Sequence, residues 1–157
     1  MFKTACATIA LIALANPALA AGCVTPKDAA ALKTAVMQQA LMVAAFQCRE
    51  ASAYNGFVTI YRKELQSSDA VLKAFFVQRG GGESGYDRFK TKAANISALE
   101  QARRSDAFCA DTHALYAAVL AHRGSLISFV DSLPAVPNMG NACIETRPAS
   151  RLARADR

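Results

Sequence analysis

The sequence predicts an all-α protein: a four-helix bundle of up-down-up-down topology, stapled by two disulfides and followed by a flexible C-terminal tail. Apolar residues recur at three- to five-residue steps over four long stretches, as on one face of a helix, and no stretch alternates as a strand would. Short connections between such helices favour antiparallel neighbours. The cysteine count gives the third observation, because four of the five cysteines follow the leader described next.

The first twenty residues have the layout of a secretory signal peptide. Lys3 supplies a basic start, a short apolar run follows, and Ala18-Leu19-Ala20 forms a small-x-small cleavage site. We therefore expect residues 1–20 to be removed and the protein to be periplasmic or secreted, with no transmembrane span. The alternative is a lipoprotein anchored at Cys23, although such signals usually carry a larger aliphatic residue where this one has alanine.

The first helix is predicted over residues 25–50 as an amphipathic rod. Thr25 is a suitable N-cap, Pro26 fits the first helical position, and Asp28 completes a capping arrangement. Its apolar positions are Leu32, Val36, Ala40, Val43 and Cys48. Residues 51–56 are predicted to form the following connection, because they end in Asn-Gly, a pair typical of turns.

The second helix is predicted over residues 57–79. Its buried stripe keeps one helical phase and comprises Phe57, Tyr61, Leu65, Ser68, Leu72, Phe75 and Phe76. Ser67-Ser68-Asp69 resembles an internal N-cap, so a break at that point is the open alternative to one continuous helix.

The glycine-rich stretch 79–85 ends the second helix. Gly80 suits a left-handed position after the helix, and Ser84 is the expected cap of the third. A phosphate-binding loop is excluded, because Tyr86 and Asp87 occupy the places where a P-loop requires Lys and Ser or Thr. The third helix is predicted from its stripe Tyr86, Phe89, Ala93, Ile96, Leu99 and Ala102.

The fourth helix is predicted over residues 106–133, after a break at Ser105-Asp106 and before Pro134. Gly124 inside it allows a bend or a close helix contact. Its stripe is Phe108, Cys109, Thr112, Leu115, Tyr116, Val119, Leu126, Ile127 and Val130. We expect one bundle domain over residues 21–133 and a tail over 134–157, anchored at Cys143.

Two disulfides are predicted from the bundle topology. If the first and fourth helices are antiparallel neighbours, Cys48 pairs with Cys109 at one end and Cys23 with Cys143 at the other. Parallel helices would instead pair Cys23 with Cys109 and Cys48 with Cys143.

The positive charge is dispersed along the chain. The net charge is +6, and the basic residues form no single block. This pattern is typical of a solvated surface and argues against nucleic-acid binding. We expect an unknown protein or cell-envelope partner, with weak contact to an anionic envelope surface as a further option.

Cys109 and His113 are the one pair that suggests metal binding. They lie four residues apart on a predicted helix and share a face, and Cys48 would lie close by. In an oxidising compartment, however, two such cysteines form a disulfide instead. We find no nucleophile motif and no cofactor motif, so we predict no catalytic residue, no cofactor and no enzyme activity.

A holdase-type chaperone is the other alternative. Phe75-Phe76-Val77, together with Met37 and Met42, could form an adhesive apolar surface, although such residues are usually core.

Two stretches resemble a known group of sequences. YNGFVTIYRKELQSSDAVLKAFF and AFCADTHALYAAVL look like small exported proteins of alphaproteobacteria. The resemblance covers most of the chain after the leader and implies a periplasmic helical domain, but it brings no activity, cofactor or catalytic residue. The sequence as a whole thus predicts an exported helical protein with a non-catalytic binding or structural role.

Overall fold

The computed structural model describes residues 24–134, and in that range the chain forms helices and no strand. The predicted all-α class is therefore confirmed. The six helices are α1 (Pro26–Gln47), α2 (Ala51–Ile60), α3 (Arg62–Gln78), α4 (Gly82–Arg103), α5 (Ser105–Ala121) and α6 (Leu126–Ser132).

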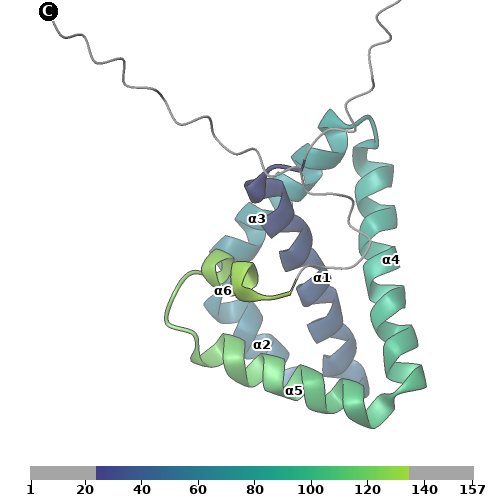
Figure 1. Ribbon diagram of the computed structural model, residues 1–157, viewed down its shortest axis with the longest axis vertical. Helices are drawn as coiled ribbons and strands as arrows, with labels where there is room; N and C mark the ends of the chain where they lie inside the picture. Colours follow the sequence, from purple (N-terminus) through teal and green to yellow (C-terminus); the bar gives the residue numbers. More distant parts are fainter. Residues whose placement is uncertain (1–23, 135–157) are drawn as a thin grey trace, which may run out of the picture.

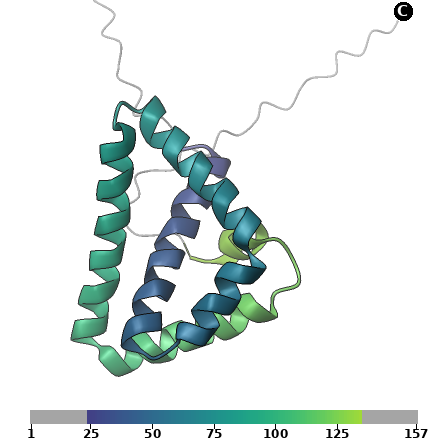
Figure 2. The ribbon, with the colours of Figure 1, turned by 180° about the vertical axis from the view of Figure 1, so that it is seen from behind.

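The helices outline a triangle around α1. Figure 1 shows α4 along one side, α2 and α3 along the other, and α5 as the base, with α1 running down inside. The view from behind shows the same arrangement (Figure 2). Helices α1 and α4 run in the same direction, α3 runs against both, and the short α6 packs on α1 and α3.

This arrangement differs from the predicted four-helix bundle. The structure has six helices within residues 24–134, and α5 crosses the C-terminal end of α1 instead of lying antiparallel along it. The reason lies in the short connection at Arg104, whose φ of −142° and ψ of 56° break the helix. Because α4 has already run down beside α1, α5 starts at the lower end and turns across it.

Helix α1 begins as predicted. The Thr25 hydroxyl oxygen accepts a hydrogen bond from the Asp28 backbone N–H at 3.1 Å, and the hydroxyl donates to the Asp28 carboxylate at 2.8 Å. The helix ends at Gln47, before the predicted boundary, because Arg49 adopts a left-handed φ of 63°.

The prediction that α1 is amphipathic is wrong. Each of the other five helices contacts α1, so even the polar Gln39 is only 7% exposed. Within the described part of the chain, α1 is also the one helix that is long and apolar enough to cross a membrane, but 56% of its most apolar stretch is buried inside the fold. Burial at the centre of the protein accounts for this composition.

Residues 51–56 form the first turns of α2, so the predicted connection there is wrong. Gly56 is accommodated because it faces α5, where an added Cβ would lie 3.8 Å from the Leu120 side chain. The second predicted helix does break, but at Tyr61 and not at Ser67-Ser68-Asp69. Burial still follows the predicted stripe, since Phe57, Tyr61, Leu65, Ser68 and Leu72 are all buried.

The turn between α3 and α4 follows the glycines. Gly80 has a φ of 73°, which confirms its predicted left-handed conformation. Ser84 does not cap α4, since the helix already begins at Gly82 and the Ser84 hydroxyl accepts a hydrogen bond from Arg88 at 2.6 Å.

The predicted stripe of α4 holds only in its first half. Ile96 and Leu99 are 52% and 54% exposed, whereas Ala93 and Ser97 are buried. The buried positions in this part of α4 therefore carry small side chains.

The fourth predicted helix is two helices, α5 and α6, separated by residues 122–125. Gly124 lies in this bend. The Ser125 hydroxyl oxygen then caps α6 by accepting from the Ser128 backbone N–H at 3.1 Å. The predicted tail, apart from Pro134, lies outside the described residues, as does the predicted signal peptide.

Candidate functional site

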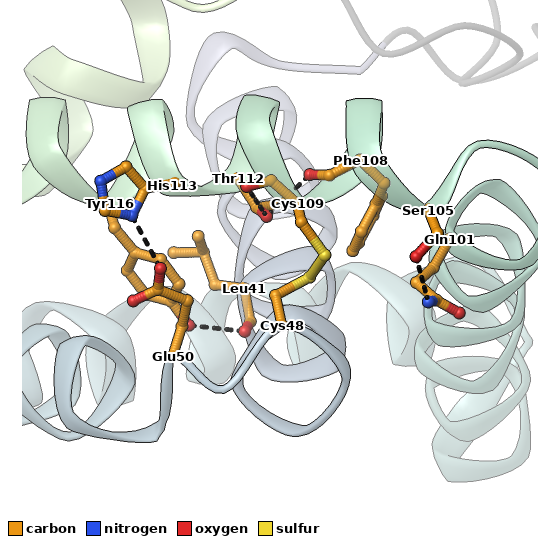
Figure 3. Close-up of a disulfide and its surroundings, with 10 residues drawn as sticks. All are labelled: Leu41, Cys48, Glu50, Gln101, Ser105, Phe108, Cys109, Thr112, His113 and Tyr116. Atoms are coloured by element: carbon orange, nitrogen blue, oxygen red, sulfur yellow. Dashed lines mark hydrogen bonds and ion pairs between the residues drawn. A yellow bond between two sulfur atoms is a disulfide. The ribbon is translucent and has the colours of Figure 1, made fainter.

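The disulfide between Cys48 and Cys109 confirms one of the two predicted pairs. It joins the residue after α1 to the second turn of α5, with Cα atoms 5.5 Å apart across a sequence separation of 61 (Figure 3). Cys23 and Cys143 lie outside the described residues, so their pairing stays a prediction.

His113 faces a carboxylate instead of the cysteines. Its Nδ1 lies 2.7 Å from Oε1 of Glu50, and Figure 3 shows the imidazole turned toward Glu50. The imidazole side chain is 72% exposed. The disulfide occupies the sulfur of Cys109, and the residues that the structure describes contain no group of three or more His, Cys, Asp or Glu placed to hold a metal ion. The geometry therefore does not support the metal site drawn from Cys109 and His113.

Tyr116 makes a second connection between α5 and α1, close to the disulfide. Its hydroxyl donates to the backbone carbonyl of Leu41 at 2.6 Å, which ties α5 to the middle of α1 (Figure 3). Burial raises the pKa of Tyr116, with smaller contributions from Tyr54 and Glu50, so the phenol stays protonated as a donor. The corner thus has the properties of a structural joint.

The aromatic residues considered for an adhesive surface pack together instead. Phe75 and Phe76 form an edge-to-face pair with ring centroids 5.1 Å apart, and Phe76 lies 5.5 Å from Phe89 of α4. Met37 is buried, and Val77 is the exposed member of the group. These contacts assign most of the predicted adhesive residues to the core.

A polar cleft of about 510 Å³ lies where α1, α2, α3 and α4 meet. It is lined by Gln38 of α1, Val58 of α2, Arg62, Leu65, Gln66 and Asp69 of α3, and Lys90 of α4. Arg62, Gln66 and Asp69 share one face of α3, because they are spaced four and three residues apart. Small-molecule sites commonly have this volume and lie between packed helices.

Asp69 is the acidic residue in the lining of the cleft, and its carboxylate has three polar partners. It accepts from the Tyr86 hydroxyl at 2.5 Å and pairs with the ammonium groups of Lys73 at 3.1 Å and Lys90 at 3.5 Å. Burial alone would raise the pKa of Asp69, but the hydrogen bonds from Tyr86 and Lys73 and the positive charges nearby lower it overall. Asp69 is therefore ionised at neutral pH.

The Tyr86 hydroxyl is fixed by its hydrogen bond to the Asp69 carboxylate. Burial, together with the hydrogen bond to Asp69, raises the pKa of Tyr86 to about 12. The Lys90 ammonium also donates to the Tyr86 hydroxyl oxygen at 3.2 Å. These contacts join α3 to α4 along one edge of the cleft.

Arg62 is a second basic group in the lining of the cleft. It is exposed at the mouth of the cleft, and no residue in the range 24–134 forms an ion pair or hydrogen bond with its guanidinium. This site was not predicted from the sequence, because its residues come from four different helices. The polar face Arg62, Gln66 and Asp69 within an otherwise core-forming helix was the available signal.

A second cleft, of about 420 Å³, lies between α1, α3 and α6. Its floor is mostly apolar, from Ala30, Ala31, Val71 and Ile127, and the charged groups of Lys27, Glu64 and Asp131 also line it. Of the charged groups in this lining, the Glu64 carboxylate already accepts a hydrogen bond from the backbone N–H of Leu126 at 2.6 Å.

Comparison with known proteins adds no assignment: the chain matches no protein-family model, no protein of curated function and no solved structure.

Proposed function

We propose that this chain is an exported, disulfide-linked helical protein that acts by binding a small ligand in the polar cleft between α1, α2, α3 and α4. The observation that carries the proposal is Arg62, a charged donor at the mouth of the cleft with no partner in the described part of the chain. An arginine with five unused N–H donors beside a pocket is a common means of ligand recognition.

Export is supported by two features. Residues 1–20 have the layout of a cleavable signal, and the Cys48–Cys109 disulfide is of a kind that persists mainly in oxidising compartments. We propose a periplasmic protein cleaved after Ala20. Amino-terminal sequencing of the protein recovered from a periplasmic fraction tests this, and a lipid-modified Cys23 would overturn it.

A second disulfide, between Cys23 and Cys143, is also proposed. The Lys33 ammonium donates to the carbonyl of Leu133 at 3.2 Å, so the chain leaves α6 beside the third turn of α1. Pro26, the first residue of α1, lies seven residues before Lys33, about 10 Å along the helix, and Cys23 precedes Pro26 by three residues in the sequence. The ten residues from Pro134 to Cys143 can extend to at most about 33 Å, which is long enough for this pairing. Mass mapping of a non-reduced digest tests the pair.

Binding is tested by blocking the cleft. Gln66 is exposed at its rim, so Gln66→Trp fills the mouth without disturbing the core. A library of small polar metabolites would be screened by thermal shift against the wild type and this variant, with the equally exposed Thr59→Trp as the matched control. We expect hits that Gln66→Trp abolishes and Thr59→Trp keeps. Hits that survive Gln66→Trp would place the binding site elsewhere.

A further inference from the structure

We infer that the polar cleft takes a small organic anion with two acidic groups, one held by Arg62 and the other by Lys90. This inference rests on the proposed binding function and names its ligand class. The two basic residues belong to different helices, α3 and α4, and both line the cleft.

The guanidinium of Arg62 has the geometry to bind a carboxylate or phosphate group. The planar guanidinium presents paired N–H donors that match two oxygens of one acidic group. Because no described residue already occupies these donors, a ligand gains this interaction without breaking another.

Lys90 can serve the second acidic group because Asp69 has two other partners, which are closer to it. Asp69 already receives the Tyr86 hydroxyl at 2.5 Å and the Lys73 ammonium at 3.1 Å, while Lys90 stands at 3.5 Å, the longest of the three. The Lys90 ammonium has three N–H donors: one contacts the Tyr86 oxygen at 3.2 Å, a second contacts Asp69 Oδ1 at 3.5 Å, and the third remains for a ligand. The ammonium group can therefore turn toward a ligand while Asp69 stays neutralised.

The balance of charge favours an anion over a cation. The lining carries two basic groups, Arg62 and Lys90, against one acidic group, Asp69, and Lys73 pairs with Asp69 from outside the lining. The side-chain amides of Gln38 and Gln66 add neutral donors and acceptors for a hydroxyl or carbonyl on the ligand. A ligand with one acidic group would satisfy only one of the two basic residues.

The test measures binding of succinate, citrate and inorganic phosphate to the oxidised protein by calorimetry at constant ionic strength. Arg62→Gln removes the guanidinium, and Lys63→Gln is the matched control, since Lys63 is the next residue, carries the same charge and does not line the cleft. We expect Arg62→Gln to weaken binding about tenfold, as for one lost charge-assisted pair, and Lys63→Gln to leave it unchanged. Lys90→Gln should weaken the dicarboxylates more than phosphate.

Three results would overturn the inference. Equal weakening by Arg62→Gln and Lys63→Gln would mean that anions respond only to overall charge. If none of the three anions binds at millimolar concentration, this ligand class is excluded. The proposed binding function would still be supported by a neutral ligand that binds the wild type and does not bind Gln66→Trp. Phosphate binding as tight as that of succinate would replace the organic diacid with an oxyanion site.

Discussion

The carboxylate of Glu64 accepts a hydrogen bond from the backbone N–H of Leu126 at 2.6 Å, across a sequence separation of 62 residues. A side chain in the first turn of α3 thereby caps the first turn of α6, a helix too short to be stable by itself. The packing of α6 onto the rest of the protein therefore depends on a residue of a distant helix.

We predict that Glu64→Ala lowers the free energy of unfolding by about 1 to 2 kcal/mol, because the Leu126 N–H loses its charged partner, while the Ser125 cap of α6 remains. Urea unfolding measures the loss, and hydrogen exchange should accelerate first in α6. Lys63→Ala, at an exposed neighbouring position, is the control and should change stability by less than about 0.5 kcal/mol. Equal effects of both variants would contradict the capping role.

Tyr86→Phe should destabilise the protein by about 2 kcal/mol at neutral pH, because a hydrogen bond to a charged carboxylate is lost. The same variant should change the alkaline limb of the stability curve. The folded pKa of Tyr86 is about 12, above the ordinary value of 10.0, so its contribution is complete below pH 10 and is lost as the pH rises toward 12. Unfolding measured from pH 8 to 11.5 should show a shallower decline for the variant. An unchanged slope would mean that Tyr86 does not titrate with folding.

Asp69→Asn tests how stability depends on pH in the acidic range. The pKa of Asp69 is lowered in the folded protein, so its ionised form adds stability above the ordinary value of 3.8, and this contribution is lost as the pH falls further. We expect the variant to be less stable than the wild type at pH 7 and to approach it in stability below pH 4. Asp87→Asn, exposed on α4, is the control and should run parallel to the wild type.

Removing the Cys48–Cys109 disulfide by a double substitution to serine should cost about 4 kcal/mol, the loop-closure estimate for cysteines 61 residues apart. The expected loss is a large part of the net stability of a domain of this size. Thermal unfolding of the variant and of the oxidised wild type measures it. A loss under about 1 kcal/mol would show that noncovalent contacts such as Tyr116 to Leu41 already hold the corner together.

Arg49→Gly should stabilise the protein by up to about 1 kcal/mol, because glycine adopts a φ of 63° without the steric cost that arginine bears. Arg49→Val should do the opposite, since a β-branched residue fits the left-handed region poorly. Chemical denaturation of the three proteins should therefore rank glycine first and valine last. Any other order would show that the Arg49 side chain makes a compensating contribution.

Local signals predicted the fold best. Thr25, Pro26 and Gly80 act within a few residues of the chain, and the structure places each as expected. The buried stripe from Phe57 to Leu72 was also correct, because a helical phase survives the break at Tyr61. That break was missed because its partner is remote: the Tyr61 hydroxyl donates to the carbonyl of Val119 at 2.9 Å.

The Cys48–Cys109 pair was predicted from a topology that the protein does not have. The pairing requires only that the end of α1 and the start of α5 lie close together, and crossing helices satisfy this as well as antiparallel ones. The polar cleft could not be predicted in the same way. Arg62 and Lys90 come from helices whose relative placement depends on the whole core, and their separation in sequence carries no periodic signal.

The central position of α1 has a consequence for biogenesis. Helix α1 leaves the ribosome before any of the helices that cover it, and its contact from Lys33 to Leu133 spans 100 residues. The apolar surface of α1 therefore stays incompletely covered until α6 has been synthesised, and in that interval it is exposed to aggregation. A factor that shields this segment during synthesis or translocation would raise the yield of native protein more than one that acts after release.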